Sequence, residues 1–351
     1  MKTYKRLYPQ VCDFENIYLA YRKARKGKRG RVQAAGFERV QDDELLALQE
    51  ELQNHSYKPG AYHSFFIHDP KKRLISAAPF RDRVVHHALC RVMEPIWERR
   101  FIHDSYANRI GKGTHRALDR AQKFSRKYRY VLQCDVRQFF PSIDHAILIA
   151  EFSRLIRDDE FLWLCGSILK SGEGVLAEEY EMVWFDGDEL FATNRPRGLP
   201  IGNLTSQFWA NVYLNELDQF VKRELKCEAY IRYVDDFVLF SDNRNLLSFW
   251  RAQIIEKIAE LRLTLHESRA QISPTLTGIP FLGFRIYPEY RLLKTRKAIR
   301  FRRKLRCLLD DYSNALVDFT KLNQTVQGWI HYVSYGDTWG LRRSVLEGVR
   351  L

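Results

Sequence analysis

The stretch "YIRYVDDFVLF", residues 230–240, decides the fold because strand-forming residues flank two adjacent carboxylates, Asp235 and Asp236. Neighbouring residues on one strand point to opposite faces of a sheet, so a single partner does not normally meet both. The two carboxylates approach the same point only at a tight turn between two short strands. There they repel each other unless a cation compensates. The stretch therefore predicts a hairpin whose turn presents two carboxylates to a cation.

The composition indicates a globular, basic protein. The chain has 351 residues, of which 45% are hydrophobic and 13% aromatic, and this excludes a disordered protein. Lys and Arg outnumber Asp and Glu by 57 to 43, which gives a formal net charge of +14. Such an excess favours a polyanionic partner, nucleic acid first and an anionic membrane surface second.

The sequence contains no segment typical of membrane insertion or secretion. No apolar run reaches the roughly 20 residues that a spanning helix needs, and the first 31 residues lack a signal-peptide core. The six cysteines are scattered without a Cys-x-x-Cys pair, which argues against a zinc site or a disulfide framework. We therefore expect a cytoplasmic protein with no membrane partner.

Strand and helix patterns alternate irregularly along the chain, which predicts an α+β fold rather than a doubly wound sheet. We expect a hairpin in 61–80 with its turn at 69–72, a strand ending near Asp135, and a strand pair in 278–287. Helices are expected in 43–60, 81–101, 198–225 and 245–263, with His86 and His87 as ordinary helix residues. An apolar stripe from Phe301 to Tyr312 predicts a last helix with one basic face. The basic run 22–31 is expected to be a solvated, partly disordered arm or an RNA-backbone contact.

The strand end at Asp135 adds a third carboxylate to the pair at 235–236. A lone Asp at a strand end is usually a cap, and a lone Asp-Asp pair is usually a surface turn. Three such carboxylates in a basic chain suggest a site for Mg²⁺, which prefers oxygen ligands and accepts substrate phosphate. Two such ions about 4 Å apart activate an attacking 3′-hydroxyl and stabilise a leaving pyrophosphate.

Five motifs carry a resemblance to a known family. "YVDD" (233–236), "CDVRQFFPSID" (134–144) and "FLGF" (281–284) resemble the palm motifs of reverse transcriptases, in the same order and spacing. "FRDRVVHHAL" (80–89) and "SYANRIGKGTHRAL" (105–118) resemble the fingers motifs of the group II intron branch. The resemblance covers about residues 60–290 and implies a right-hand polymerase with fingers, palm and a short helical thumb. It implies an N-terminal arm and fingers in 1–127, a palm in 128–290 with a fingers-side insertion at about 147–197, and a thumb in 291–351.

The resemblance also implies roles for single residues. Asp135, Asp235 and Asp236 are expected to be catalytic and to bind two Mg²⁺ ions together with the Val136 carbonyl. Phe140 is expected to exclude a ribose 2′-hydroxyl, with a core aromatic as the alternative. The bidentate guanidinium of Arg73, helped by Lys72, is expected to hold the incoming triphosphate, although a basic hairpin turn can equally be solvated. Phe281, Leu282, Gly283 and Phe284 are expected to brace the primer end.

Two departures from the wider pattern refine these expectations. Most relatives carry Gln-Gly-x-x-x-Ser-Pro where this chain has "IGNLTSQ" (201–207), with Ile201 for Gln and Gln207 for Pro. Both residues are expected near the nucleotide, and the variant resembles the reverse transcriptases of diversity-generating retroelements, which misinsert opposite template adenines. The other departure is "HESRAQI" (266–272), where Arg269 stands in place of a Lys that protonates pyrophosphate. Arg hardly titrates, so His266 is the alternative general acid.

These features favour an RNA-directed DNA polymerase of a bacterial or phage diversity-generating retroelement. Its expected partners are template RNA, the primer or cDNA strand, dNTPs and a small basic accessory protein. One alternative is a stand-alone reverse transcriptase of phage defence, which gene neighbourhood would distinguish. Another is a non-catalytic, maturase-like RNA-binding protein, which has no need of the complete set of three carboxylates.

Overall fold

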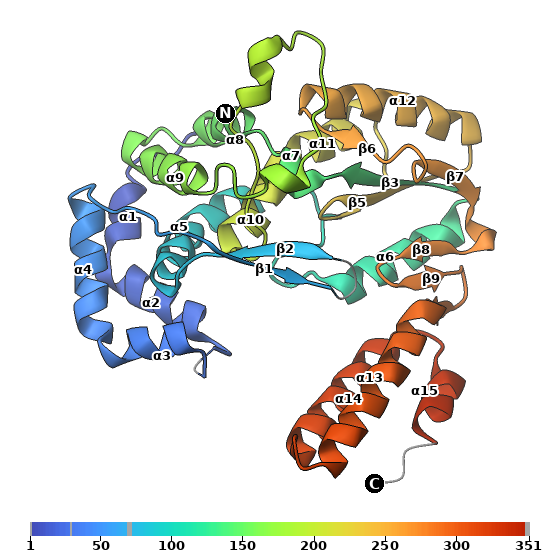
Figure 1. The fold of residues 1–351 in the computed structure, drawn as a ribbon. Coiled ribbons are helices and arrows are strands. Elements are labelled where there is room, and N and C mark those ends of the chain that lie inside the picture. The colour runs from blue at the N-terminus through green and yellow to red at the C-terminus, as the bar shows by residue number, and fades with distance from the viewer. Residues whose placement is uncertain (1, 29, 69–71, 348–351) are drawn as a thin grey trace. The chain divides into compact units, whose positions relative to one another are not determined.

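The computed structural model describes residues 2–28, 30–68 and 72–347 of the chain (Figure 1). It divides into two compact units, each built from separate segments. Unit 1 comprises 1–103, 135–226 and 252–266, and unit 2 comprises 104–134, 227–251 and 267–351. The α+β class predicted from the sequence is confirmed. The division does not test the predicted boundaries of fingers, palm and thumb, which stay a prediction.

The N-terminal part of unit 1 is a group of helices in which three pack on one long helix and a fourth packs on those three. They are α1 (Tyr8–Cys12), α2 (Phe14–Arg25), α3 (Val32–Arg39), α4 (Gln41–Gln53) and α5 (Phe80–Glu98). Asp13 begins α2 by accepting the Asn16 N–H at 3.1 Å. The buried face of α2 repeats at helical spacing and packs on α5, in the blue and cyan region of Figure 1: Ile17, Ala20, Tyr21 and Ala24. Because α2 extends to Arg25, the expectation of a disordered arm is wrong for residues 22–25.

The predicted hairpin in 61–80 is confirmed. Strands β1 (His63–Ile67) and β2 (Arg73–Ala77) pair antiparallel, with Ile67 opposite Arg73. Of the predicted turn at 69–72, residues 69–71 lie outside the described part of the chain. The helix predicted from 81 follows directly as α5.

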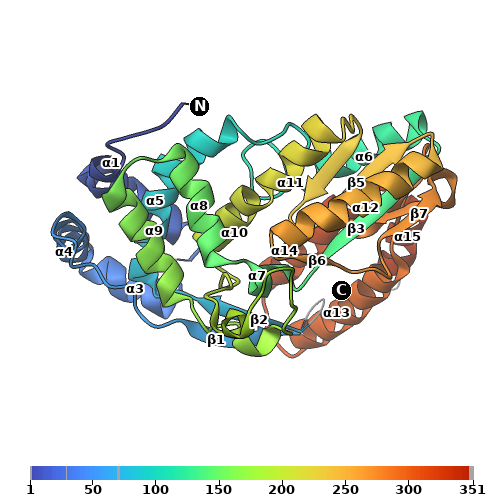
Figure 2. The same cartoon turned by 90° about the horizontal axis from the view of Figure 1, so that it is seen from above.

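The rest of unit 1 is mainly helical. It contains α7 (Phe139–Ser142), α8 (His145–Leu155), α9 (Asp159–Ser171), α10 (Leu204–Tyr213), α11 (Asn215–Gln219) and the π-turn η3 (Phe220–Glu224). Helix α8 lies between α9 and α10 (Figure 2). The segment from α9 to α10 contains two short 3₁₀ turns, η1 (Ala177–Glu179) and η2 (Leu190–Asn194). Buried Asp144 caps α8 and forms an ion pair with Arg195, which ties this segment to the start of α8. Asp144 also forms an ion pair with Arg262.

Strand β3 (Tyr130–Arg137) is the central strand of the main sheet. The strand order is β4 (Tyr230–Tyr233), β5 (Asp236–Ser241), β3 and β6 (Thr264–Leu265), and β7 (Gln271–Pro274) also pairs with β3. Within unit 2, Tyr130–Gln133 of β3 pair antiparallel with β7. Within unit 1, Val136 and Arg137 pair antiparallel with β6. The strand runs two residues past Asp135, where the sequence predicted its end.

Unit 2 also contains a helix that precedes β3, a small three-stranded sheet and the last three helices. The elements are α6 (Thr114–Lys127), η4 (Thr275–Thr277), β8 (Ile279–Phe281), β9 (Phe284–Ile286), β10 (Arg291–Leu293), α13 (Thr295–Ser313), α14 (Phe319–Val333) and α15 (Trp339–Leu346). Helices α13 and α14 pack side by side (Figure 1), with the rings of Phe301 and Trp329 stacked at 4.1 Å. The apolar stripe predicted for α13 is confirmed at Phe301 and Leu305, which are buried. Helix α12 (Arg244–Glu260) runs from unit 2 into unit 1. In the described part of the chain, no helix is long and apolar enough to cross a bilayer.

Candidate active site

The turn between β4 and β5 in unit 2 has the geometry that the paired carboxylates predicted. Tyr233 pairs with Asp236, so Val234 and Asp235 form a two-residue turn between the strands. Val234 has φ of +58°, a left-handed conformation that β-branched residues rarely adopt. Both Asp235 and Asp236 are half-buried. A strained backbone thus presents two adjacent carboxylates at one hairpin end, where strain is often part of function.

Arg232 braces this turn, and sequence reasoning missed it. Its residue is fully buried, and its guanidinium Nη1 donates to the Val234 carbonyl at 3.1 Å. The Arg232 backbone also bonds with the segment before α6: its N–H donates to Asp104 O and its carbonyl accepts the Tyr106 N–H, both at 3.0 Å. Arg120 in turn holds the Asp104 carboxylate through two bonds of 3.0 Å. The signal in the sequence was a lone Arg inside an apolar strand, three residues before Asp235.

A second cation of unit 2 interacts with the turn. Lys294, at the start of α13, has a lowered pKa, mainly because its ammonium loses solvation, although the residue as a whole is exposed. The Asp236 carboxylate acts in the opposite direction, while Lys297, Arg285 and Arg269 lower the pKa further. Arg269 itself is exposed, in the turn that precedes β7. The predicted Arg269 thus belongs to the charged surroundings of Lys294, whose pKa the Asp236 carboxylate also affects.

Asp135 lies on β3 in unit 1, beside His266. The carboxylate of Asp135 is 13% exposed, and its Oδ2 lies 3.9 Å from His266 Nε2. The His266 N–H also donates to the Asp135 carbonyl at 2.9 Å, which fixes the two residues by backbone and side chain. Next to them, Val136 is buried and pairs with Leu265 of β6. The general-acid role of His266 or Arg269 stays a prediction.

Phe140 differs in exposure from its neighbour Phe139. Phe139 is buried in the core at 3% exposure, whereas Phe140 is half-buried. The two rings lie 5.4 Å apart at 61°, in an edge-to-face contact. The Phe140 carbonyl accepts the Leu199 N–H at 2.9 Å, which joins helix α7 to the loop before α10. Phe140 is thus less buried than Phe139, and its role as a steric gate stays a prediction.

The other predicted nucleotide-binding residues of unit 1 lie in the β1–β2 hairpin, in the loop before α10 and in α10 itself. Arg73 begins β2 and is exposed, and exposed Lys72 lies with its ammonium 4.2 Å from the Phe66 ring centre. Ile201 is half-buried in the loop, and its carbonyl accepts the Ser76 N–H of β2 at 2.8 Å. Gln207 is exposed on α10. The structure thus joins the strand of Arg73 directly to the loop of Ile201.

The predicted primer-bracing segment, Phe281–Phe284, forms the β8–β9 hairpin of unit 2. Leu282 and Gly283 are its turn, with φ of +46° and +94°, a conformation suited to two-residue hairpins. Phe281 and Phe284 are buried and anchor the hairpin, and the primer-bracing role of the segment stays a prediction. Helices α13 and α14 support the turn, because Tyr332 donates to the Leu282 carbonyl at 3.3 Å and bonds with Lys297.

The oxygen donors of the three aspartates and the Val136 carbonyl suit a hard divalent cation. Among the described residues, no group of three or more His, Cys, Asp or Glu side chains is already gathered to hold a metal ion. The strained turn at Val234 and the half-buried carboxylates fit a cation, since they hold negative charge where solvation is incomplete. Binding of a metal by these residues stays a prediction.

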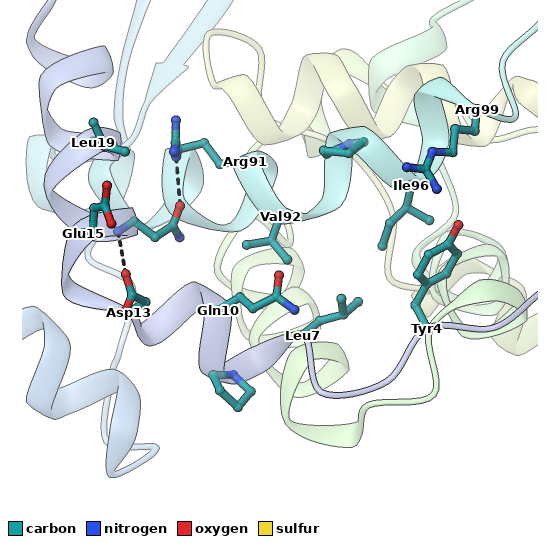
Figure 3. Close-up of a pocket in the computed structure, with 13 residues that line it drawn as sticks. Tyr4, Leu7, Gln10, Asp13, Glu15, Leu19, Arg91, Val92, Ile96 and Arg99 are labelled. Carbon is teal, nitrogen blue, oxygen red and sulfur yellow. Dashed lines mark hydrogen bonds between the residues drawn. The ribbon is translucent and has the colours of Figure 1, made fainter.

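The cavity in Figure 3 is a different feature of unit 1. It has a volume of about 780 Å³ and is lined by residues of α1, α2, α5 and the adjoining segments, with none of the predicted site residues. Arg91 Nε donates to the Asn16 side chain at 2.8 Å, which ties α5 to α2 across the cavity wall. It is therefore a joint between helices and not the candidate active site.

Comparison with known proteins identifies relatives over most of the chain. A family described as "Reverse transcriptase (RNA-dependent DNA polymerase)" matches residues 61–286. Protein YkfC of Escherichia coli is 28% identical over 323 residues, covering 76% of this chain and 79% of its own. The group II intron-encoded protein LtrA of Lactococcus lactis is 24% identical over 229 residues, covering 63% of this chain and 36% of its own.

Two further similarities come from eukaryotes. Nuclear intron maturase 2 of Arabidopsis thaliana is 28% identical over 269 residues, covering 64% of this chain and 37% of its own. The apo telomerase structure of Candida tropicalis, truncated from its C-terminal domain, has a TM-score of 0.48 at 10% identity. It covers 70% of this chain and 59% of its own. The chain spans little more than a third of LtrA and of the maturase.

Proposed function

The chain belongs to the reverse transcriptase family, and we propose that it synthesises DNA on an RNA template with Asp135, Asp235 and Asp236 as its catalytic carboxylates. The observation that carries the proposal is the β4–β5 turn, where left-handed Val234 presents Asp235 and Asp236 together. The inclusion of Asp135 rests on the motif "CDVRQFFPSID" (134–144), which resembles one of the palm motifs of reverse transcriptases. The substrates are template RNA, a primer or cDNA strand, and dNTPs.

Two Mg²⁺ ions are part of this proposal, held by the three carboxylates and the Val136 carbonyl. When bound, such ions activate a 3′-hydroxyl and stabilise the charge of the leaving pyrophosphate. The chain's own residues do the rest. Arg73, with Lys72, holds the triphosphate through charge-assisted hydrogen bonds. Half-buried Phe140 excludes a 2′-hydroxyl, and the β8–β9 hairpin supports the primer end.

We further propose that the enzyme serves a diversity-generating retroelement, in the cytoplasm of a bacterium and encoded by the bacterium or a phage. The support is the segment 201–207, where Ile201 and Gln207 replace the Gln and Pro of most members of this branch. A small basic accessory protein is the proposed partner. A maturase-like, binding-only function is the second candidate, because Nuclear intron maturase 2 is among the relatives.

Primer extension on an adenine-rich RNA template tests the proposal, with the product sequenced. We expect a DNA product that requires a divalent cation, with errors concentrated opposite template adenines. Tight RNA binding without any DNA product would support the maturase-like alternative. A DNA product without excess errors opposite adenine would support the polymerase activity but contradict the assignment to a diversity-generating retroelement.

A further inference from the structure

Asn203 makes unusual use of its side chain. It occupies the residue before α10, where an Asn side chain commonly accepts a backbone N–H of the first helical turn. Here the side chain makes no such cap. It is buried at 2% exposure and directs its amide away from the helix. The capping preference of Asn therefore does not explain this residue.

The amide of Asn203 instead joins the loop to β2 and the residue that follows it. Its Nδ2 donates to the Ser76 carbonyl at 2.8 Å and to the Pro200 carbonyl at 3.0 Å. Its Oδ1 accepts the Ala78 N–H at 3.0 Å. One side chain thus satisfies three buried backbone groups that lie up to 127 residues away in sequence. Loss of a partner for such groups is costly.

The two preceding loop residues contact the same strand. The Ile201 carbonyl accepts the Ser76 N–H at 2.8 Å. Gly202 has φ of +118°, and a Cβ there would lie 3.0 Å from Ile75 Cγ2. Residues 201–203 therefore lie close to Ile75, Ser76 and Ala78, and a side chain at 202 would be crowded by Ile75 and strained at this φ.

We propose that Asn203 is a positioning residue that holds the strand of Arg73 against the loop of Ile201. This inference rests on the proposed function, in which Arg73 binds the triphosphate and Ile201 lies near the base pair. Arg73 is three residues from Ser76, or about 10 Å along the strand. A nucleotide held at both ends needs that spacing fixed, because a small misplacement of a binding group weakens productive binding.

Ser206, in the first turn of α10, provides a matched control because it bonds to the same loop. It is buried at 3% exposure, and its Oγ donates to the Pro200 carbonyl at 2.7 Å, the same acceptor that Asn203 uses. The hydroxyl thus supports the loop itself rather than its connection to β2. Ser206→Ala removes loop support alone, whereas Asn203→Ser removes the connection to β2 and keeps a good helix-capping residue.

The test measures KM and kcat for dNTPs on an RNA template, with hydrogen exchange of residues 73–78. We expect Asn203→Ser to raise KM about tenfold, or ~1.4 kcal/mol, with kcat changed less, and to speed exchange in 73–78. Ser206→Ala is expected to leave both close to wild type. Asn203→Asp keeps the side-chain volume and the acceptor for Ala78. Asn203→Asp replaces Asn203→Ser in the test if the latter does not fold. It is expected to raise KM and to speed exchange in 73–78 as well.

Two results would overturn the inference. One is a wild-type KM and wild-type exchange in every folded Asn203 variant. The other is an equal effect of Ser206→Ala, which would assign the change to the loop alone. If the wild-type protein makes no DNA, the proposed function fails. The exchange rates still report whether Asn203 holds β2, so the two failures are distinguishable.

Discussion

At the scale of single residues, adjacent Phe139 and Phe140 offer a sharp contrast. Phe140→Ala is expected to admit ribonucleotides, because the half-buried ring is proposed to stand where a 2′-hydroxyl would lie. Phe139→Ala is the control: its ring is 3% exposed, so its loss should cost about 3–5 kcal/mol in stability. Competition between dATP and ATP in primer extension measures the discrimination. If Phe140→Ala discriminates between dATP and ATP as wild type does, Phe140 is a core aromatic and not a steric gate.

Ile201 is expected to influence fidelity. An aliphatic side chain offers no hydrogen bond to the nascent base pair, so a mispair loses less relative to a correct pair. One net hydrogen bond is worth roughly 0.5–1.5 kcal/mol, or about 2- to 12-fold in discrimination. Ile201→Gln should therefore lower misinsertion opposite adenine several-fold and change other errors less. Sequencing cDNA copied by both proteins from one template measures this. Equal error rates opposite template adenine in the two proteins would show that Ile201 does not influence fidelity.

Glu151 gives a pH-dependent prediction. Burial, followed by repulsion from Glu216, raises the pKa of Glu151 from 4.5 to about 7, although Arg154 acts against this. Between these pH values the folded protein binds more protons than the unfolded chain, so stability falls as pH rises through the window. Glu151→Gln should remove this component, so that its Tm advantage over wild type grows from pH 5 to pH 8. Parallel Tm curves for the two proteins would contradict this.

At the scale of elements, the β8–β9 turn depends on Gly283. A Cβ there would lie 2.6 Å from both Lys297 Cε and the Tyr332 hydroxyl, at a φ of +94°. Gly283→Ala should therefore destabilise the protein by about 1–3 kcal/mol and weaken primer binding. Gly328→Ala in α14 is the control, since no atom lies within 4 Å of the added Cβ. Thermal unfolding and primer titration measure both variants. A Tm of Gly283→Ala equal to that of wild type would contradict the claim that the β8–β9 turn depends on Gly283.

The elements that the sequence predicted are those built from local patterns. Alternating apolar residues and turn signals gave the hairpins β1–β2, β4–β5 and β8–β9, and helical periodicity gave α5 and α13. What the sequence did not reveal depends on distant partners. The brace from Arg232 to Val234, the charge of Lys294 near Asp236 and the bond from Asn203 to Ser76 each need tertiary structure. The disordered-arm alternative for the basic run is wrong at 22–25, because these residues continue helix α2, which packs on α5.

At the scale of the whole molecule, the net charge of +14 predicts RNA binding that weakens steeply with salt. Arg22, Lys23, Arg25, Lys26 and Arg91 line a basic cavity of about 550 Å³ in unit 1. If Lys23 and Lys26 meet phosphates, replacing both by Gln should reduce the log–log salt slope by about 1.4 for single-stranded RNA. Lys257→Gln is the control, since that lysine already pairs with Glu260 at 2.8 Å. An unchanged slope in the double variant would exclude this cavity from RNA binding.

The most direct test of the central claim is primer extension on an RNA template by wild type, Asp235→Asn and Asp242→Asn. Asp235→Asn keeps the size of the turn residue but removes the charge proposed to hold the metal. Asp242→Asn removes the same charge just after the other end of β5, where the carboxylate bonds to the Arg129 N–H at 2.9 Å. We predict that Asp235→Asn binds RNA and unfolds like wild type but makes no DNA, while Asp242→Asn still extends the primer. Near-wild-type extension by Asp235→Asn at saturating Mg²⁺ would contradict the account.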